Sequence, residues 1–423
     1  MAAAPGSAES ATLRAIGRRV LPLPFLLGLV SILDRTNISY AALEMNADLG
    51  FSATVYGLGA GILFLGYFLF EVPSNLALQR FGARRWLARI AVSWGVIAAA
   101  MALVHDETVF YLLRFLLGVA EAGLFPGVVL YLTYWFPARH RARATGWFMR
   151  SVPVASILGG PLSGWLDGVF GLSGWQFLFV VQGLPAVALG VVLWRLLPGT
   201  PAEARWLTAA QRAWLSTELA ADAATAAPGH RLTDALRTGR VWAFTAAYFC
   251  YAIGEYGLIF FLPQIVRRMH FTDTEVGFVG AVPFLVGAAA MVLVARSSDR
   301  TGERRWHFAG SMLVMAAGLL GAALSMSVPP VALGFLVLVG VGAFGALGTF
   351  WPAPTALLTG TAAAAGIAVV NSIGNIAGFA GPYAMGYLVD RTGGFLTGLV
   401  MLAVFAAGGA AVYLAAARPG RRA

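Results

Sequence analysis

The sequence predicts an all-α polytopic membrane protein, with twelve transmembrane helices in two pseudo-symmetric six-helix bundles. Of its 423 residues, 59% are hydrophobic and only 11% are charged, and the mean hydropathy is +0.76. That composition is typical of a membrane protein and not of a soluble globule. Apolar stretches long enough to cross a bilayer, about 20 residues each, recur along the chain. Landmarks of the first half also recur in the second, which predicts two related bundles.

Each expected span is an apolar stretch bounded by polar or turn-forming residues. The first six expected spans are Val20–Ala42, Ala53–Ala77, Leu87–Val104, Thr108–Phe136, Ala144–Asp167 and Trp175–Leu196. The other six are 242–266, 274–296, 307–327, 331–358, 363–389 and 395–417. Between the two sets lies the longest polar stretch of the chain, 197–241. Thr208 followed by Gln211 has the spacing of a capping box, so we expect a surface helix over Thr208–Ala220.

The two halves carry the same landmarks at nearly one offset. Arg80-x-Gly82-x-Arg84-Arg85-Trp86 recurs 220 residues later as Arg300-x-Gly302-x-Arg304-Arg305-Trp306, and Gly160-Pro161 recurs 221 residues later as Gly381-Pro382. A duplication related by an axis along the membrane normal places a midplane site at the seam between the halves, as in secondary transporters. The domains we expect are a tail over 1–19, bundles over 20–196 and 242–417, the linker at 197–241, and a tail over 418–423.

The arginines orient the chain. All 29 basic residues are arginine, and 22 of them fall in the tails and in the loops on one side, with three on the opposite side and four inside spans. The positive-inside rule then places both termini and the linker in the cytoplasm. The net charge of +10 is spread over short loops instead of one patch, so we expect no nucleic-acid partner.

Charges inside the expected spans are the candidate functional residues. Arg114, Gly118 and Glu121 lie at i, i+4 and i+7 on one face of the fourth span, while Asp34 and Arg35 lie in the first. Ionisable groups at this depth are costly unless they face partners or water, and they usually mark substrate or ion pathways. The alternative is a structural charge pair. An arginine suits a carboxylate substrate, because its planar fork grips both oxygens and keeps its charge.

Three further charges are open to two interpretations each. Glu71 would serve a structural role near the cytoplasmic end of its span, capping or pairing with loop arginines, or would belong to the pathway. Arg150 would reach the membrane surface or form a second anion contact suited to a dicarboxylate. Glu255 would partner a cation or select the substrate.

Several stretches together resemble the anion:cation symporter branch of the major facilitator superfamily, including bacterial permeases for tartrate, phthalate and sugar acids. The loop Ser297–Arg305 resembles the superfamily's loop signature, and its copy at Asn75–Arg85 departs from it at Gln79. The branch-specific stretches are ILDRTNISYA (32–41), FEVPSNLALQRFGARRW (70–86), RFLLGVAEAGLFPG (114–127), YLTYWFPARHRAR (131–143) and NSIGNIAGF (371–379).

The resemblance implies roles for particular residues. Arg35 would bind the substrate carboxylate, Asp34 would pair with Arg114 and help to carry the coupling proton, and Glu121 would be the second protonation site. Because Glu121 lies two turns from Arg114, we expect it to feel that arginine less than a directly paired Asp34 would. Asn371 and Asn375 would bind substrate oxygens from the second half, and we add Arg150, Glu255 and Tyr40 as substrate contacts. The gating loops would use Arg80, Gly82, Arg84, Asp299, Arg300, Gly302 and Arg304.

We therefore expect a monomeric secondary transporter in a bacterial inner membrane, without a cofactor or metal, that takes up an organic acid anion together with protons. An exchanger or uniporter of the same fold is the closest alternative. A membrane-embedded enzyme is disfavoured because the five histidines fall in loops or at span ends and Cys250 is the only cysteine. A receptor of the same fold would not need both embedded carboxylates of the first half.

Overall fold

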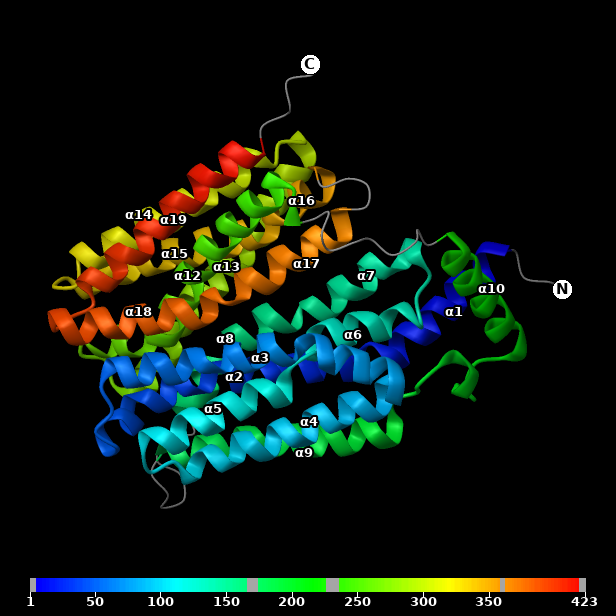
Figure 1. Cartoon of the computed structure of the whole chain (residues 1–423), viewed down its shortest axis with the longest axis horizontal. Coiled ribbons are helices and arrows are strands. Elements are labelled where there is room, and N and C mark those ends of the chain that lie inside the picture. The colour runs from blue at the N-terminus through cyan, green and yellow to red at the C-terminus, as the bar shows by residue number, and fades with distance from the viewer. Residues whose placement is uncertain (1–4, 166–173, 226–235, 358–361, 418–423) are drawn as a thin grey trace.

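The structure is a computed structural model that describes residues 5–165, 174–225, 236–357 and 362–417, and no strand occurs in these ranges. Figure 1 shows two bundles of long, roughly aligned helices, one built from each half of the chain. The predicted fold class is confirmed.

The first bundle contains six spans, of which two are built from a pair of shorter helices. Its helices are α2 (Pro22–Asp48), α3 (Ala53–Phe81), α4 (Ala83–Ala100), α5 (Glu107–Glu121), α6 (Leu124–Thr133), α7 (Ala138–Met149), α8 (Ser151–Trp165) and α9 (Gly174–Leu196), with a 3₁₀ turn at Met101–Leu103.

The second bundle repeats this plan. Its helices are α12 (Gly239–Arg267), α13 (Asp273–Thr301), α14 (Arg305–Leu324), α15 (Pro329–Phe350), α16 (Pro352–Leu357), α17 (Ala362–Asn375), α18 (Ala377–Thr392) and α19 (Leu396–Ala416). Over the described residues, ten helical stretches are long and apolar enough to cross a membrane. The expected spans at 144–167 and 363–389 are not among the ten, and the described residues of each lie in two helices, α7 with α8 and α17 with α18.

The break in the fourth span departs from the expected continuous helix. One helix was expected over Thr108–Phe136. Instead, Gly123 has a φ of +81° between α5 and α6, a left-handed conformation that glycine adopts without steric cost. Glu121 is therefore the last residue of α5 and lies beside a turn. Hydropathy does not reveal such a break because the apolar stretch continues through it.

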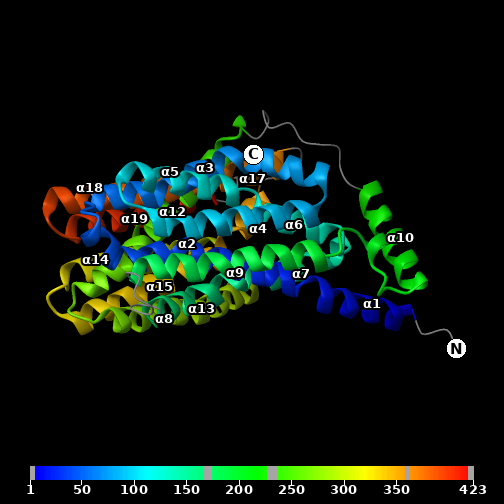
Figure 2. The ribbon, with the colours of Figure 1, turned by 90° about the horizontal axis from the view of Figure 1, so that it is seen from below.

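Two surface helices cover one end of the first bundle. No helix was predicted in the tail over 1–19, but its described part belongs to helix α1 (Pro5–Val20). Helix α10 (Ala209–Thr225) of the linker follows a reciprocal pair of hydrogen bonds between Thr208 and Gln211. Arg139 at the start of α7 bonds to Glu9 of α1 and to Glu218 of α10, both at 2.8 Å. Figure 2 shows both helices beyond that end of the bundle.

The two bundles meet closely toward the opposite end, which we call the distal end and define by the turns at 49–52, 268–272 and 393–395. Here a Cβ atom on Gly57 of α3 would overlap the carbonyl oxygen of Pro382 in α18. A Cβ atom on Gly160 of α8 would likewise overlap the carbonyl oxygen of Gly277 in α13. Small residues thus let helices of opposite halves approach closely.

Candidate substrate and proton site

Arg35 and Glu121 form a direct ion pair inside the first bundle. Nη2 of Arg35 on α2 lies 2.6 Å from Oε2 of Glu121 at the end of α5, and their side chains are 12% and 1% exposed. The Ser31 hydroxyl, one turn before Arg35, donates to the other carboxylate oxygen at 3.4 Å. A direct contact between Arg35 and Glu121 was not among the expected pairs, and the position of α2 brings the two side chains together.

Aromatic rings surround the arginine. The guanidinium carbon of Arg35 lies 5.3 Å from the ring centre of Tyr67 and 5.7 Å from that of Phe64, both on α3. Tyr256 of α12 brings the second half to this point, with its ring 4.6 Å from that of Phe64. Rings at this range attract the cation and exclude water from it. Phe64 and Tyr67 were not predicted as site residues, because aromatics are common in any apolar helix; their i, i+3 spacing on one face was the only available signal.

Asp34 and Arg114 have partners other than each other. The Asp34 carboxylate accepts hydrogen bonds from the Trp94 indole at 2.8 Å and from the Asn37 amide at 3.0 Å. Arg114 donates to the backbone carbonyl oxygens of Gly59 and Ala60 on α3, at 3.1 and 3.2 Å. Among the residues that the structure describes, no ion pair joins Asp34 to Arg114, so the expected direct pair is wrong. Adjacent residues on a helix point about 100° apart, and here Arg35, not Asp34, points to the fourth span.

Both of these groups are nevertheless fully buried near the ion pair. Asp34 and Glu121 are each at most 1% exposed, and Arg114 is not exposed at all. Nη1 of Arg114 has no hydrogen-bond partner within the described part of the chain. Two carboxylates and two guanidinium groups thus share one buried region, where proton gain or loss by either carboxylate changes the energy of the other groups.

Glu255 is the embedded carboxylate of the second half. It lies on α12 next to Tyr256 and is partly buried, and the described residues give it no ion pair. Its neighbour Tyr256 contacts Phe64, so Glu255 lies close to the seam that Arg35 also approaches. A carboxylate without a counter-ion at this depth is suited to bind a proton or a hydrogen-bond donor of a ligand.

Asn371 and Asn375 lie in the last two turns of α17, immediately before the break that separates α17 from α18. Both are partly buried. Gly374 between them packs against the ring of Tyr248 on α12, which keeps α17 beside the span that carries Glu255. The structure thus puts these two amides on the second half's side of the seam, and no described hydrogen bond joins them to Arg35 or Glu121.

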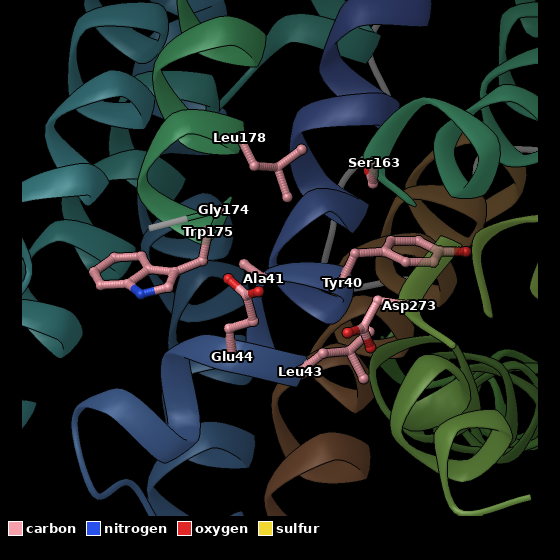
Figure 3. Close-up of a pocket in the computed structure, with 9 residues that line it drawn as sticks. All are labelled: Tyr40, Ala41, Leu43, Glu44, Ser163, Gly174, Trp175, Leu178 and Asp273. Carbon is pink, nitrogen blue, oxygen red and sulfur yellow. The ribbon is translucent and has the colours of Figure 1, made fainter. Parts of the chain in front are cut away.

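Tyr40 lies at the seam, nearer the distal end than Arg35. It lines two small pockets, and its hydroxyl lies close to Gly160 of α8 and Gly280 of α13. Figure 3 shows one of these pockets, with Tyr40 between Ser163 and Asp273. Tyr40 is therefore more than one turn of α2 away from the Arg35–Glu121 pair. Its side chain lies in the contact between the two halves.

Arg150 and Glu71 differ from their expected surroundings. Arg150 lies at the junction of α7 and α8 and is exposed, instead of two turns inside a continuous helix. Glu71 on α3 is partly buried, and the described residues give it no ion pair with a loop arginine, so the pairing that favoured a structural role is absent here. Its backbone carbonyl accepts the amide of Asn75 at 2.9 Å.

These charges, on a scaffold of two equivalent bundles, match a known family. A family model described as Major Facilitator Superfamily matches residues 24–382 and 244–423. The chain belongs to the major facilitator superfamily. Like other members it is a multi-pass transporter and not an enzyme.

Individual relatives agree with this assignment. A "Putative tartrate transporter" of Agrobacterium vitis is 49% identical over 399 residues, which cover 93% of this chain and 89% of the relative. A "Quinolone resistance transporter" of Acinetobacter baumannii is 41% identical over 94% of this chain and 92% of the relative. Among solved structures, a bacterial homologue of the human lysosomal transporter Spinster superposes with a TM-score of 0.77 at 19% identity, covering 95% of this chain and 97% of that one.

The loops that carry the superfamily signature place a glycine with a positive φ at the same repeat position, although its ψ is 144° in the first loop and 0° in the second. Gly82 and Gly302 have φ angles of +84° and +67°, just before α4 and α14. Arg84 lies 3.8 Å from Glu203 of the linker, while Asp299, Arg300 and Arg304 are exposed. No ion pair across the two signature loops occurs in the described part of the chain.

Glu303 in the second signature loop caps the helix that follows. Its carboxylate accepts the backbone N–H of Trp306 at 2.7 Å and of His307 at 3.2 Å. Burial alone would raise the pKa of Glu303, but these hydrogen bonds and the His307 ring hold that pKa below its ordinary value. The loop carboxylate therefore stays charged at neutral pH.

Proposed function

We propose that this transporter takes up an organic carboxylate together with protons across a bacterial inner membrane, with both termini in the cytoplasm. The observation that supports this most is the buried Arg35–Glu121 pair, 2.6 Å long, between α2 and α5. It offers a fixed cation for a substrate carboxylate and a titratable anion that competes for the same cation. The chain's relatives include one named as a tartrate transporter, so tartrate is the first substrate to test.

Competition for one guanidinium couples the anion to the proton. In this pair the positive charge of Arg35 neutralises the charge of the Glu121 carboxylate. A substrate carboxylate that takes over the fork of Arg35 leaves Glu121 as an uncompensated buried charge, which is costly. Protonation of Glu121 removes that cost, so anion and proton bind together and leave together. This is the thermodynamic requirement for symport.

Asp34 and Arg114, which are buried near the Arg35–Glu121 pair, would support this exchange. Asp34 is held by Trp94 and Asn37, and Arg114 is held by two carbonyl oxygens of α3. We assign Asp34 to the second proton position. In our proposal Arg114 keeps the pocket's net charge near neutrality when Arg35 is engaged by substrate.

The rest of the substrate would extend across the seam toward the second half. Glu255, Asn371 and Asn375 would bind its hydroxyl groups, Tyr256 would close the aromatic surround, and Tyr40 would contact it from the distal end. Hydroxydiacids, sugar acids and aromatic acids all present a carboxylate for Arg35. The relative named as a quinolone resistance transporter is a reason to add an aromatic carboxylate to the substrate panel.

Transport then follows from rocking one bundle against the other around the fixed site. The signature loops with Arg80, Gly82, Arg84 and their copies at Asp299, Arg300, Gly302 and Arg304 would engage when the cytoplasmic side closes. In this conformation the close contacts between the two halves lie toward the distal end, as expected of a transporter that is closed to the outside.

The test is uptake of labelled tartrate by purified protein in liposomes. An acidic exterior should drive accumulation above the equilibrium level, and collapse of the pH gradient should abolish it. Uptake that is independent of the pH gradient but requires an anion inside the vesicle would favour the alternative, an anion exchanger. Uptake that only equilibrates would favour a uniporter.

Arg150→Ala should separate diacids from monoacids. If exposed Arg150 provides a second anion contact, we expect tartrate uptake to fall about ten-fold, the effect of one charge-assisted hydrogen bond. Threonate, which has a hydroxymethyl group in place of one tartrate carboxylate, should lose less than about two-fold. The loss for each acid is measured by how strongly the unlabelled acid competes with labelled tartrate for uptake. An equal loss for the two acids would contradict the second contact.

A further inference from the structure

A hydrogen-bonded contact joins the two halves at the distal end, outside the substrate site. The Asp390 carboxylate in the last turn of α18 accepts the backbone N–H of Ala53 at 3.0 Å and the backbone N–H of Thr54 at 2.7 Å. Ala53 and Thr54 are the first two residues of α3. One half of the transporter thus supplies the cap for a helix of the other half.

The physical basis is the unsatisfied start of a helix. The first four N–H groups of a helix have no partner within it, and the helix start carries partial positive charge. In α3 the Ser52 hydroxyl accepts only the N–H of Val55, at 3.2 Å. The Asp390 carboxylate accepts the N–H groups of Ala53 and Thr54, which precede Val55, and places a full negative charge at the start of α3. The start of α3 is therefore completed only while α18 is docked.

The equivalent helix of the second half does not need such help. Helix α13 corresponds to α3 in the duplication, and it begins with its own capping box between Thr272 and Glu275. Asp167, the last residue of the fifth expected span, lies outside the described residues. Of these two helix starts, only that of α3 is described as drawing on a carboxylate of the opposite half.

The surrounding contacts are consistent with an interface between α3 and α18 that can open. A Cβ atom on Gly386 of α18 would overlap the carbonyl oxygen of Ala53, so the two backbones touch at this point. The bonds to Asp390 are solvent-exposed, and water can replace them when the helices part. Exposed charge-assisted bonds contribute modestly to stability, which suits a contact that forms and breaks in every cycle.

We propose that Asp390 is a positioning residue that holds the distal end closed and releases α3 when that end opens. This inference rests on the alternating access of the proposed function, but not on the substrate's identity or on proton coupling. Loss of the carboxylate should shift the substrate-free transporter toward the state that is open at the distal end. Because the start of α3 would then depend on water and Ser52 alone, the shift requires no change in the substrate site.

The test is a distance measurement between the halves at the distal end. Spin labels are attached to cysteines replacing exposed Ala47 on α2 and exposed Leu396 on α19, in a chain whose single native cysteine is removed as Cys250→Ala. We expect the short distance to dominate in the parent. In Asp390→Ala the ratio of long to short distances should rise about ten-fold, and Asp390→Asn, which keeps one acceptor oxygen, should give a smaller rise.

The matched control is Asp106→Asn. Asp106 also caps a helix start at the distal end, accepting the N–H of Val109 at 2.8 Å, but within its own half. It should lower thermal stability without moving the distance ratio. Equal shifts in Asp106→Asn and Asp390→Asn would show a merely structural role, and an unchanged ratio in folded Asp390→Ala would overturn the proposal. The readout needs no substrate, so failure of tartrate or proton transport leaves it interpretable.

Discussion

Glu121→Gln should abolish proton-driven accumulation and tighten tartrate binding. The amide resembles the protonated carboxyl group in shape, so the site would behave as permanently protonated. Arg35 would lose its ionic partner and be free for the substrate. We expect the inside-to-outside ratio of labelled tartrate to fall to about one under an inward proton gradient. Tartrate binding at pH 7.5 should be about ten-fold tighter, since the competing charge is gone.

The control for this variant is Glu107→Gln, which removes an exposed carboxylate from the first turn of the same helix, α5. Because Glu107 lies at the opposite end of α5 from Glu121, its loss should leave gradient-driven accumulation within about two-fold of the parent. Full accumulation by Glu121→Gln would remove Glu121 from the coupling mechanism. Counterflow of tartrate in the same vesicles distinguishes lost coupling from a misfolded protein.

Arg35→Lys should weaken tartrate binding by about 100-fold. Lysine keeps the positive charge but cannot offer two parallel N–H groups to a carboxylate, and a lost bidentate pair is worth about 3 kcal/mol. The aromatic surround of Phe64 and Tyr67 holds a planar guanidinium better than a compact ammonium group. Tartrate-dependent thermal shifts of purified protein measure the loss, because a ligand of the folded state raises its melting temperature.

Arg89→Lys provides the comparison for the arginine substitution. Arg89 also lies inside an expected span and stacks on an aromatic ring, 4.2 Å from Trp86, but it is on α4 and away from the ion pair. The substitution Arg89→Lys should leave the tartrate-dependent rise in melting temperature unaltered. If both lysine variants bound tartrate like the parent, the carboxylate would be held elsewhere.

The fold was predictable because its signals are long and redundant. Apolar length, arginine placement and the repeated RxGxRRW landmark each indicate two six-helix units. The breaks that shape the spans were not predictable, since hydropathy runs unchanged through Gly123 and through Ile376. A helix also formed in the tail before Val20, where the charges of Arg139 and Glu9 meet.

The cluster of buried charges was predictable from the sequence, but the pairing of its members was not. Embedded charges identified Asp34, Arg35, Arg114 and Glu121, because each is expensive in hydrocarbon. Which of two adjacent residues faces α5 depends on the rotation of α2, and that rotation is set by distant packing. Trp94 on α4 bonds to Asp34 and so directs Arg35 to Glu121. A buried tryptophan N–H needs an acceptor, but the sequence does not say which one.

The most direct test of the Arg35–Glu121 exchange is the number of protons taken up when tartrate binds. Titration calorimetry of the detergent-purified transporter in two buffers of different ionisation enthalpy measures that number at pH 7.5. The exchange predicts proton uptake on tartrate binding in the parent chain, and about one proton fewer per tartrate in Glu121→Gln. Tartrate binding without proton uptake in the parent, or with equal uptake in the variant, would contradict it.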